Sequence, residues 1–103
     1  MVIVSVQYPN QPGSRFDERY YLDRHATLVK ERWGPFGLTA AQFLRGTGAP
    51  GGGGATYAVM ALLTFASQDA LDKALAAHGR EIMGDIPNFT DVRPVVQVNE
   101  VMG

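Results

Sequence analysis

Apolar and polar residues follow patterns typical of β-strands along four stretches of the chain. Residues 57–65 are the most apolar of these, with apolar side chains on both faces of the predicted strand. The other three stretches are less apolar and are bounded by residues that favour turns, such as Pro9 to Gly13. The sequence therefore predicts strands at residues 2–8, 39–45, 57–65 and 92–101.

Two further stretches place apolar residues at helical spacing. Ser14 or Asp17 can cap the first helix, which we expect to end at about Arg32, just before Gly34-Pro35. Ser67 can cap the second helix, and Gly79 is its expected end. The predicted order of elements along the chain is β-α-β-β-α-β.

This order predicts one α+β domain over residues 1–103, a ferredoxin-like plait with a four-stranded antiparallel sheet and both helices on one face. The other face of the sheet would then be bare, although residues 57–65 are apolar on both faces, with Ala58, Met60 and Leu62 on one of them. A large exposed apolar face is unusual for a monomer. We therefore expect a homodimer in which the open faces of two sheets pack together.

A histidine lies on the apolar side of the first predicted helix. At about 100° per residue, four residues fall within roughly 60° of His25 on the helix surface, namely Tyr21, Leu22, Leu28 and Val29. A buried imidazole without a partner costs on the order of 1–3 kcal/mol. His25 is therefore the first candidate for an acid/base residue, with Tyr21 as a candidate donor to an oxyanion. The structural alternative is a core histidine bonded to a backbone carbonyl or a tyrosine hydroxyl.

Composition narrows the classes of partner. The 103 residues carry a net charge of -1 and contain no cysteine. A near-neutral chain without long runs of like charge gives no reason to expect nucleic acid or a membrane as a partner. The lack of cysteine excludes disulfides and thiolate sites and fits a cytoplasmic location. The opening residues 1–4 indicate a strand rather than a signal peptide, and no apolar run reaches the roughly 18 residues of a membrane span.

The remaining motifs do not indicate a cofactor or a metal. Gly46 to Gly51 fits the dinucleotide pattern G-x-G-x-x-G, but it leads into a strand, whereas a phosphate site needs a helix N-terminus. Two distant histidines without a carboxylate cluster provide no metal-binding set, so we expect no metal, nicotinamide or flavin. His78 is interpreted as a residue at the C-terminal end of the second helix. Glu18 and Arg32 are expected to reach solvent.

Two motifs resemble those of a known family. Phe16-Asp17, Tyr20-Tyr21 and His25, followed later by residues 85–90 (Asp-Ile-Pro-Asn-Phe-Thr) before the last strand, are similar to the EthD family of the dimeric α+β barrel superfamily. The resemblance covers nearly the whole chain. One difference is that Ala26-Thr27-Leu28 follows the histidine here, where the family pattern has a proline.

The resemblance implies a ferredoxin-like protomer, a barrel formed across a homodimer, and a cavity between helices and sheet for a small hydrophobic ligand. It adds Tyr20, Asn88, Phe89 and Thr90 to the candidate ligand-binding residues. Asn88 and Thr90 could instead satisfy backbone groups of their own turn. Trp33 either forms part of the cavity wall or packs the helix against the sheet.

Three functions are compatible with these residues. The first is cofactor-independent acid/base catalysis of the isomerase, cyclase or decarboxylase type in catabolic or tailoring metabolism. His25 would be the acid/base, and Tyr21 or Asn88 would hold the carbonyl or enolate. The second is an accessory protein that binds an apolar compound for a separate oxidative degradation system, since family members are often labelled reductases. The third is a haem-handling dimer, with His25 or His78 on the iron.

Overall fold

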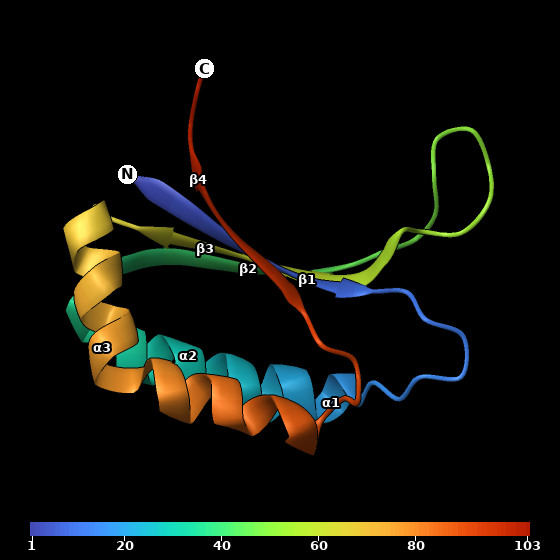
Figure 1. The fold of residues 1–103 in the computed structure, drawn as a ribbon, viewed down its shortest axis with the longest axis horizontal. Coiled ribbons are helices and arrows are strands. Elements are labelled where there is room, and N and C mark those ends of the chain that lie inside the picture. Colours follow the sequence, from blue (N-terminus) through green and yellow to red (C-terminus); the bar gives the residue numbers. More distant parts are fainter.

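Four antiparallel strands form one sheet, and every helix packs on the same side of it (Figure 1). The computed structural model describes all 103 residues. The strand order is β2-β3-β1-β4, which is the predicted ferredoxin-like arrangement. The strands are β1 (Val2–Pro9), β2 (Leu38–Arg45), β3 (Tyr57–Phe65) and β4 (Val95–Glu100).

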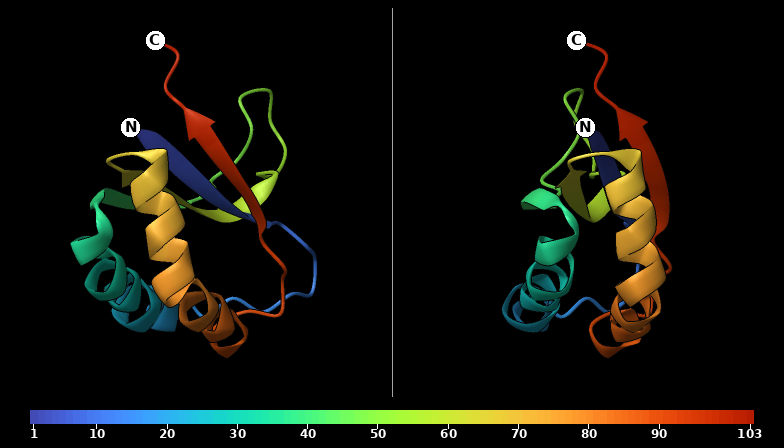
Figure 2. Two further views of the ribbon diagram at one scale, coloured as in Figure 1. Left: turned by 60° about the vertical axis from the view of Figure 1, so that its left-hand side comes forward. Right: turned by 90° about the vertical axis from the view of Figure 1, so that its left-hand side faces the viewer.

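The helical layer has two main rods that lie side by side beneath the sheet (Figure 2). The first rod is built from three consecutive pieces and the second is a single helix. The first rod consists of α1 (Glu18–Tyr20), a π-helical turn (Tyr21–His25) and α2 (Ala26–Trp33). The second rod is α3 (Gln68–Asp85). Short 3-10 turns follow at Gly34–Phe36 and Ile86–Asn88. None of these helices has both the length and the apolar character needed to cross a bilayer.

Both helix starts lie at predicted capping residues. The Asp17 carboxylate accepts a hydrogen bond from the Tyr20 amide at 3.0 Å, and the Ser67 hydroxyl accepts one from the Ala70 amide at 3.0 Å. Each bond satisfies an amide that has no partner within the helix. The first rod also ends its regular helix at Trp33, before Gly34-Pro35, as predicted.

The prediction that Gly79 ends the second helix is wrong. Gly79 is buried within α3 and lacks the left-handed backbone that a C-terminal glycine cap requires. The helix continues to Asp85 and thereby places the Asp85 carboxylate beside the N-terminal part of the first rod. His78 is consequently a mid-helix residue whose Nδ1 lies 3.2 Å from Glu81, and its predicted place at a helix end is also wrong.

The last strand is shorter than predicted, because it begins at Val95 instead of Val92 and ends at Glu100. Pro94 has no amide hydrogen to contribute to the sheet. The Val92 amide instead donates to the Thr90 hydroxyl at 3.1 Å. The preceding residues therefore form a loop against the helical layer.

Two groups of buried side chains lie between the sheet and the helices. The larger group packs α2 and α3 on the middle of the sheet, with Phe65 and Trp33 at 5.7 Å between ring centroids. The smaller group is largely aromatic and includes Tyr8, Tyr21 and Phe89. This aromatic cluster lies where α1 and the end of α3 meet the sheet, and it positions the candidate site.

The opposite face of the sheet is uncovered, as predicted (Figures 1 and 2). It also carries polar side chains at its centre. Met60 and Leu62 of β3 lie on this face and are only partly buried. Beside them, the Asn99 amide donates to the Ser5 hydroxyl at 3.2 Å. The face therefore combines apolar side chains with an ordered polar strip.

Candidate functional site

The imidazole of His25 is paired with a carboxylate from the other helical rod. Its Nδ1 lies 2.9 Å from Oδ2 of Asp85, and His25 is only 5% exposed. A carboxylate can only accept hydrogen bonds, so the hydrogen of a neutral imidazole lies on Nδ1. The other ring nitrogen, Nε2, makes no hydrogen bond within the protein and keeps a free lone pair.

The π-helical turn from Tyr21 to His25 explains how these two side chains share one face. The Ala26 amide donates to the Tyr21 carbonyl, which is five residues earlier and not the four of an α-helix. The wider turn stacks the Tyr21 and His25 rings, with centroids 5.8 Å apart and planes 14° apart. Leu22 lines an open cavity beside Tyr21 and is 51% exposed, so it does not share the burial of His25.

Asp85 occupies an unfavourable position that its hydrogen bonds offset. It is the last residue of α3, where the helix dipole disfavours a negative charge. Its Oδ1 accepts hydrogen bonds from the Tyr20 hydroxyl at 2.7 Å and from the Asn88 amide at 3.0 Å. Together with His25 these donors engage both oxygens, which fixes the carboxylate against the imidazole.

The two partners differ in charge near neutral pH. Burial lowers the pKa of His25, and the hydrogen bond and charge of Asp85 oppose this only in part. Burial raises the pKa of Asp85, but the hydrogen bonds from Tyr20, Asn88 and His25 outweigh it and hold that pKa below its usual range. The pair is therefore a neutral imidazole against a carboxylate, which is the arrangement of a general base.

Tyr21 supplies the one buried side-chain polar atom without a partner. Tyr21 is only 2% exposed, and its hydroxyl is buried yet makes no hydrogen bond. Burial raises the pKa of this phenol, so it stays protonated and is available as a donor. An orphaned buried hydroxyl costs about 1–3 kcal/mol, and such a group is expected where a ligand supplies the missing partner.

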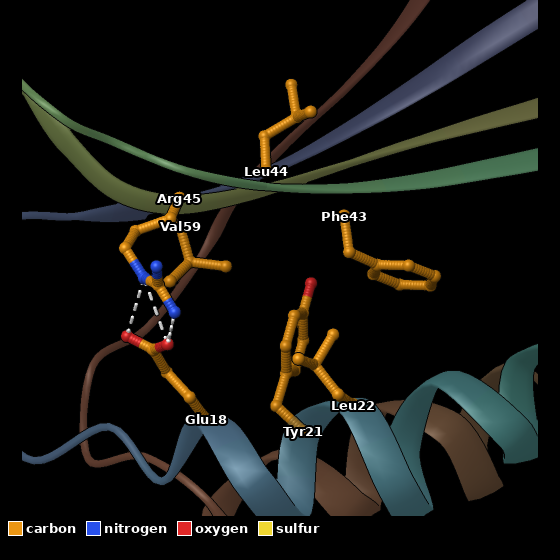
Figure 3. Close-up of a pocket in the computed structure, with 7 residues that line it drawn as sticks. All are labelled: Glu18, Tyr21, Leu22, Phe43, Leu44, Arg45 and Val59. Carbon is orange, nitrogen blue, oxygen red and sulfur yellow. Dashed lines mark hydrogen bonds and ion pairs between the residues drawn. The ribbon is translucent and has the colours of Figure 1, made fainter.

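A cavity opens beside these residues at the end of the sheet (Figure 3). Its outer part has a volume of about 270 Å³, with Tyr21 and Phe43 among its walls and Glu18 and Arg45 at one side. Tyr21 and Phe43 also border a separate, narrow inner crevice of about 30 Å³, whose walls include His25. The apolar walls of the crevice and the size of the outer part suit a small organic molecule.

Glu18, which was expected to reach solvent, forms an ion pair with Arg45. The guanidinium of Arg45 donates through Nε to both carboxylate oxygens of Glu18, at 3.0 and 3.2 Å, and through Nη2 to one of them. The pair joins α1 to the end of β2 across the side of the cavity (Figure 3). Arg32, which was also expected to reach solvent, pairs with Glu81 on the surface.

Three of the candidate ligand-binding residues surround the His25–Asp85 pair without bordering the cavity. Tyr20 and Asn88 bind the Asp85 carboxylate, and Asn88 is exposed to solvent. Phe89 is completely buried, and its ring lies 4.7 Å from the His25 ring. The structure therefore places these three residues as supports of the pair.

Trp33 and Thr90 lie further from the pair. The Trp33 indole donates to the Ala74 carbonyl at 2.8 Å, and its ring borders the inner crevice from the main core. The Thr90 hydroxyl donates to the Arg15 carbonyl at 2.6 Å and accepts from the Val92 amide. The hydrogen bonds of Thr90 thus connect the loop before β4 to the segment before α1.

Sequence reasoning missed Asp85 and Phe43 as site residues. Asp85 is 60 positions from its partner His25, and no local pattern joins the two. One signal was present, because an acidic residue directly before Ile86-Pro87 stands at the negative end of a helix and needs donors nearby. Phe43 lies in the predicted strand at residues 39–45, and nothing in the sequence indicates that it borders a cavity.

Solved structures of other proteins match this chain over nearly its whole length. No protein-family model and no curated protein matches the chain. An EthD-like protein from Ralstonia eutropha JMP134 matches with 36% identity and a TM-score of 0.90, over 99% of this chain and 92% of that one.

Two more distant structures show the same fold. An ethyl tert-butyl ether D (EthD) family protein from Bacillus halodurans C-125 has 21% identity and a TM-score of 0.79, with 99% of each chain covered. A dabb family protein with a ferredoxin-like fold from Mesorhizobium loti has 15% identity and a TM-score of 0.61, covering 99% of this chain and 97% of that one. The full-length match at 36% identity, together with the fold and the motifs around His25, shows that this chain belongs to the EthD-like family.

Proposed function

We propose that this protein catalyses proton transfer on a small apolar carbonyl or enol compound, with its own side chains as the acid/base machinery. The observation that carries the proposal is the His25–Asp85 pair at a crevice whose walls include His25 and Tyr21, together with the unpartnered hydroxyl of Tyr21. A base and a hydrogen-bond donor are the two groups that enolisation requires. Membership of the EthD-like family supports a small-molecule ligand.

The chemistry follows from the two free groups. Nε2 of His25 takes a proton from a C–H next to a carbonyl, the electron pair of that bond forms a carbon–carbon double bond, and the π pair of the carbonyl moves to its oxygen. The Tyr21 hydroxyl donates to the oxygen as it becomes an enolate, while Asp85 stabilises the imidazolium. Return of the proton to another carbon gives an isomerisation, and an attack by the enolate carbon on a second carbonyl gives a cyclisation.

The lowered pKa of His25 extends the pH range of the base. An ordinary histidine, with a pKa near 6.5, is protonated and inactive as a base in mildly acidic solution. Because burial lowers the pKa here, the neutral form persists to lower pH. The acid limb of the rate profile is therefore expected below pH 6.5.

The proposal is tested with 2-tetralone, a bicyclic ketone with acidic C–H bonds beside its carbonyl. The protein is expected to accelerate exchange of these hydrogens in D₂O above the buffer rate, measured by mass spectrometry. Binding of 2-tetralone without accelerated exchange would contradict catalysis and favour the accessory, ligand-holding role.

Replacement of Tyr21 by phenylalanine is expected to make the protein more stable and less active. Removal of an unsatisfied buried hydroxyl raises the free energy of unfolding by about 1 kcal/mol. The loss of one donor to the enolate lowers the exchange rate about tenfold, the equivalent of ~1.4 kcal/mol. Urea unfolding and 2-tetralone exchange measure the two effects.

Tyr20→Phe is the matched control for stability, because the Tyr20 hydroxyl is bonded to Asp85. This neighbouring variant is expected to be less stable than the wild type. A Tyr21→Phe protein that is destabilised, or that exchanges 2-tetralone at the wild-type rate, would contradict the assigned role of the hydroxyl.

We also propose that the protein is a homodimer through the uncovered face of the sheet. Leu62 and Met60 are partly buried on that face, and the exposed Leu44 side chain points away from the cavity toward the same side (Figure 3). Sedimentation is expected to give a dimer at micromolar concentration and a monomer for Leu62→Lys. Leu75→Lys, at a 45% exposed position of α3, is expected to leave the dimer intact. A wild-type monomer would contradict this proposal.

The haem-handling alternative is not proposed. The space that reaches the imidazole of His25 is a crevice of about 30 Å³. A tetrapyrrole needs far more room beside its axial ligand. His78 lies on the surface of α3 against Glu81 and Phe36, away from the cavity.

A further inference from the structure

The ion pair at the side of the cavity carries an inference about the ligand. Glu18 and Arg45 are the only charged residues that line the outer part of the cavity, whose other walls are apolar or aromatic. Both side chains reach solvent, at 44% exposure for Glu18 and 67% for Arg45. An ion pair this exposed adds little to folding, so its position at the cavity calls for another explanation.

The geometry of the pair shows what Arg45 can bind. Nε and Nη2 of its guanidinium, the two donors on one side of the fork, both face the Glu18 carboxylate. This is the bidentate geometry that arginine adopts with any carboxylate. A ligand carboxylate can take the same place if Glu18 rotates into solvent, and its partial exposure leaves room for that movement.

The distance from this pair to the base sets the length of the ligand. Glu18 precedes His25 by seven positions along the same helical rod, which corresponds to roughly 10 Å of helix. Tyr21 lies between them, with its hydroxyl directed toward the sheet in the cavity (Figure 3). A flat ligand of two fused rings covers about this length, and its rings would lie among Tyr21, Phe43 and Val59.

We propose that Arg45 is a specificity-determining residue that pairs with a carboxylate on a bicyclic aromatic ligand whose other end reaches His25. Glu18 occupies the guanidinium when the ligand is absent. This inference rests on the proposed function for the place of the ligand, and it adds the chemical class: an aromatic carboxylic acid in its anionic form.

The test compares 2-naphthoate with 2-naphthamide, which have the same shape and differ in charge. Calorimetric titration of the wild type is expected to show at least fivefold tighter binding of 2-naphthoate. Glu18→Gln removes the competing carboxylate and is expected to tighten 2-naphthoate binding further while the amide is unaffected. Arg45→Met is expected to abolish the preference for the anion.

Arg32→Met is the matched control, because Arg32 makes a similar pair with Glu81 outside the cavity. It is expected to keep the wild-type preference, and circular dichroism verifies that each variant is folded. Equal affinity of the wild type for both probes, or an unchanged preference in Arg45→Met, would overturn the inference.

The outcome is distinguishable from failure of the proposed function. Wild-type exchange of 2-tetralone, which has no carboxylate, tests the base independently of Arg45. Accelerated exchange without a preference for 2-naphthoate overturns the role of Arg45 alone. Absence of both accelerated exchange and binding of either naphthalene probe overturns the proposed function and this inference together.

Discussion

His25→Gln is expected to lower the rate of deuterium exchange into 2-tetralone by roughly 10²–10⁴-fold, the usual contribution of a placed acid/base residue. Glutamine is close in size to histidine and can still donate to Asp85, so the fold and the cavity are retained. It has no basic nitrogen at the position of Nε2. Binding of 2-tetralone is therefore expected to stay within a few fold of the wild type.

His78→Gln is the matched control for this loss, because His78 is the second histidine of the chain and lies away from the cavity. It is expected to exchange 2-tetralone at the wild-type rate. Equal rates for His25→Gln and the wild type would remove His25 from the mechanism and leave a protein that only binds.

Asp85→Asn is expected to lower the exchange rate about 10²-fold, although His25 itself is not replaced. The asparagine amide can donate to Nδ1 of His25, which moves the imidazole hydrogen to Nε2 and removes the lone pair that acts as base. Loss of the Asp85 charge also removes the interaction that raises the pKa of His25. The acid limb of the remaining activity is therefore expected at lower pH than in the wild type.

Asp23→Asn is the corresponding control, because Asp23 belongs to the same π-helical turn as His25 but is exposed and pairs with Arg19. It is expected to leave the exchange rate and its pH dependence unchanged. An acid limb that moves to higher pH in Asp85→Asn would contradict the assigned direction of the Asp85–His25 interaction.

The fold was largely predictable because the two hydrophobic periods are clear in this chain. Alternation in residues 2–8 and a continuous apolar run in residues 57–65 mark the two central strands, and Asp17 and Ser67 mark the helix starts. The ends were less predictable. Gly79 can remain in a helix because nothing at that point requires a left-handed backbone, so a glycine alone is a weak stop signal.

The site was predictable only where it depends on one helix face. The inward direction of His25 and Tyr21 follows from periodicity, although Leu22 of the same π-helical turn lines the open cavity and is not buried. Asp85 could not be placed, because its contact with His25 depends on how two helices pack and on a helix that runs past Gly79. Tertiary contacts of this kind leave no local pattern in one sequence.

The most direct test of the account is the protonation of the His25 ring, measured by ¹⁵N NMR of labelled protein as a function of pH. We expect Nδ1 to carry the hydrogen at neutral pH, Nε2 to be an unprotonated acceptor, and the ring to titrate below pH 6.5. A hydrogen on Nε2 at neutral pH, or a titration at or above pH 6.5, would contradict a neutral base that Asp85 holds ready at the cavity.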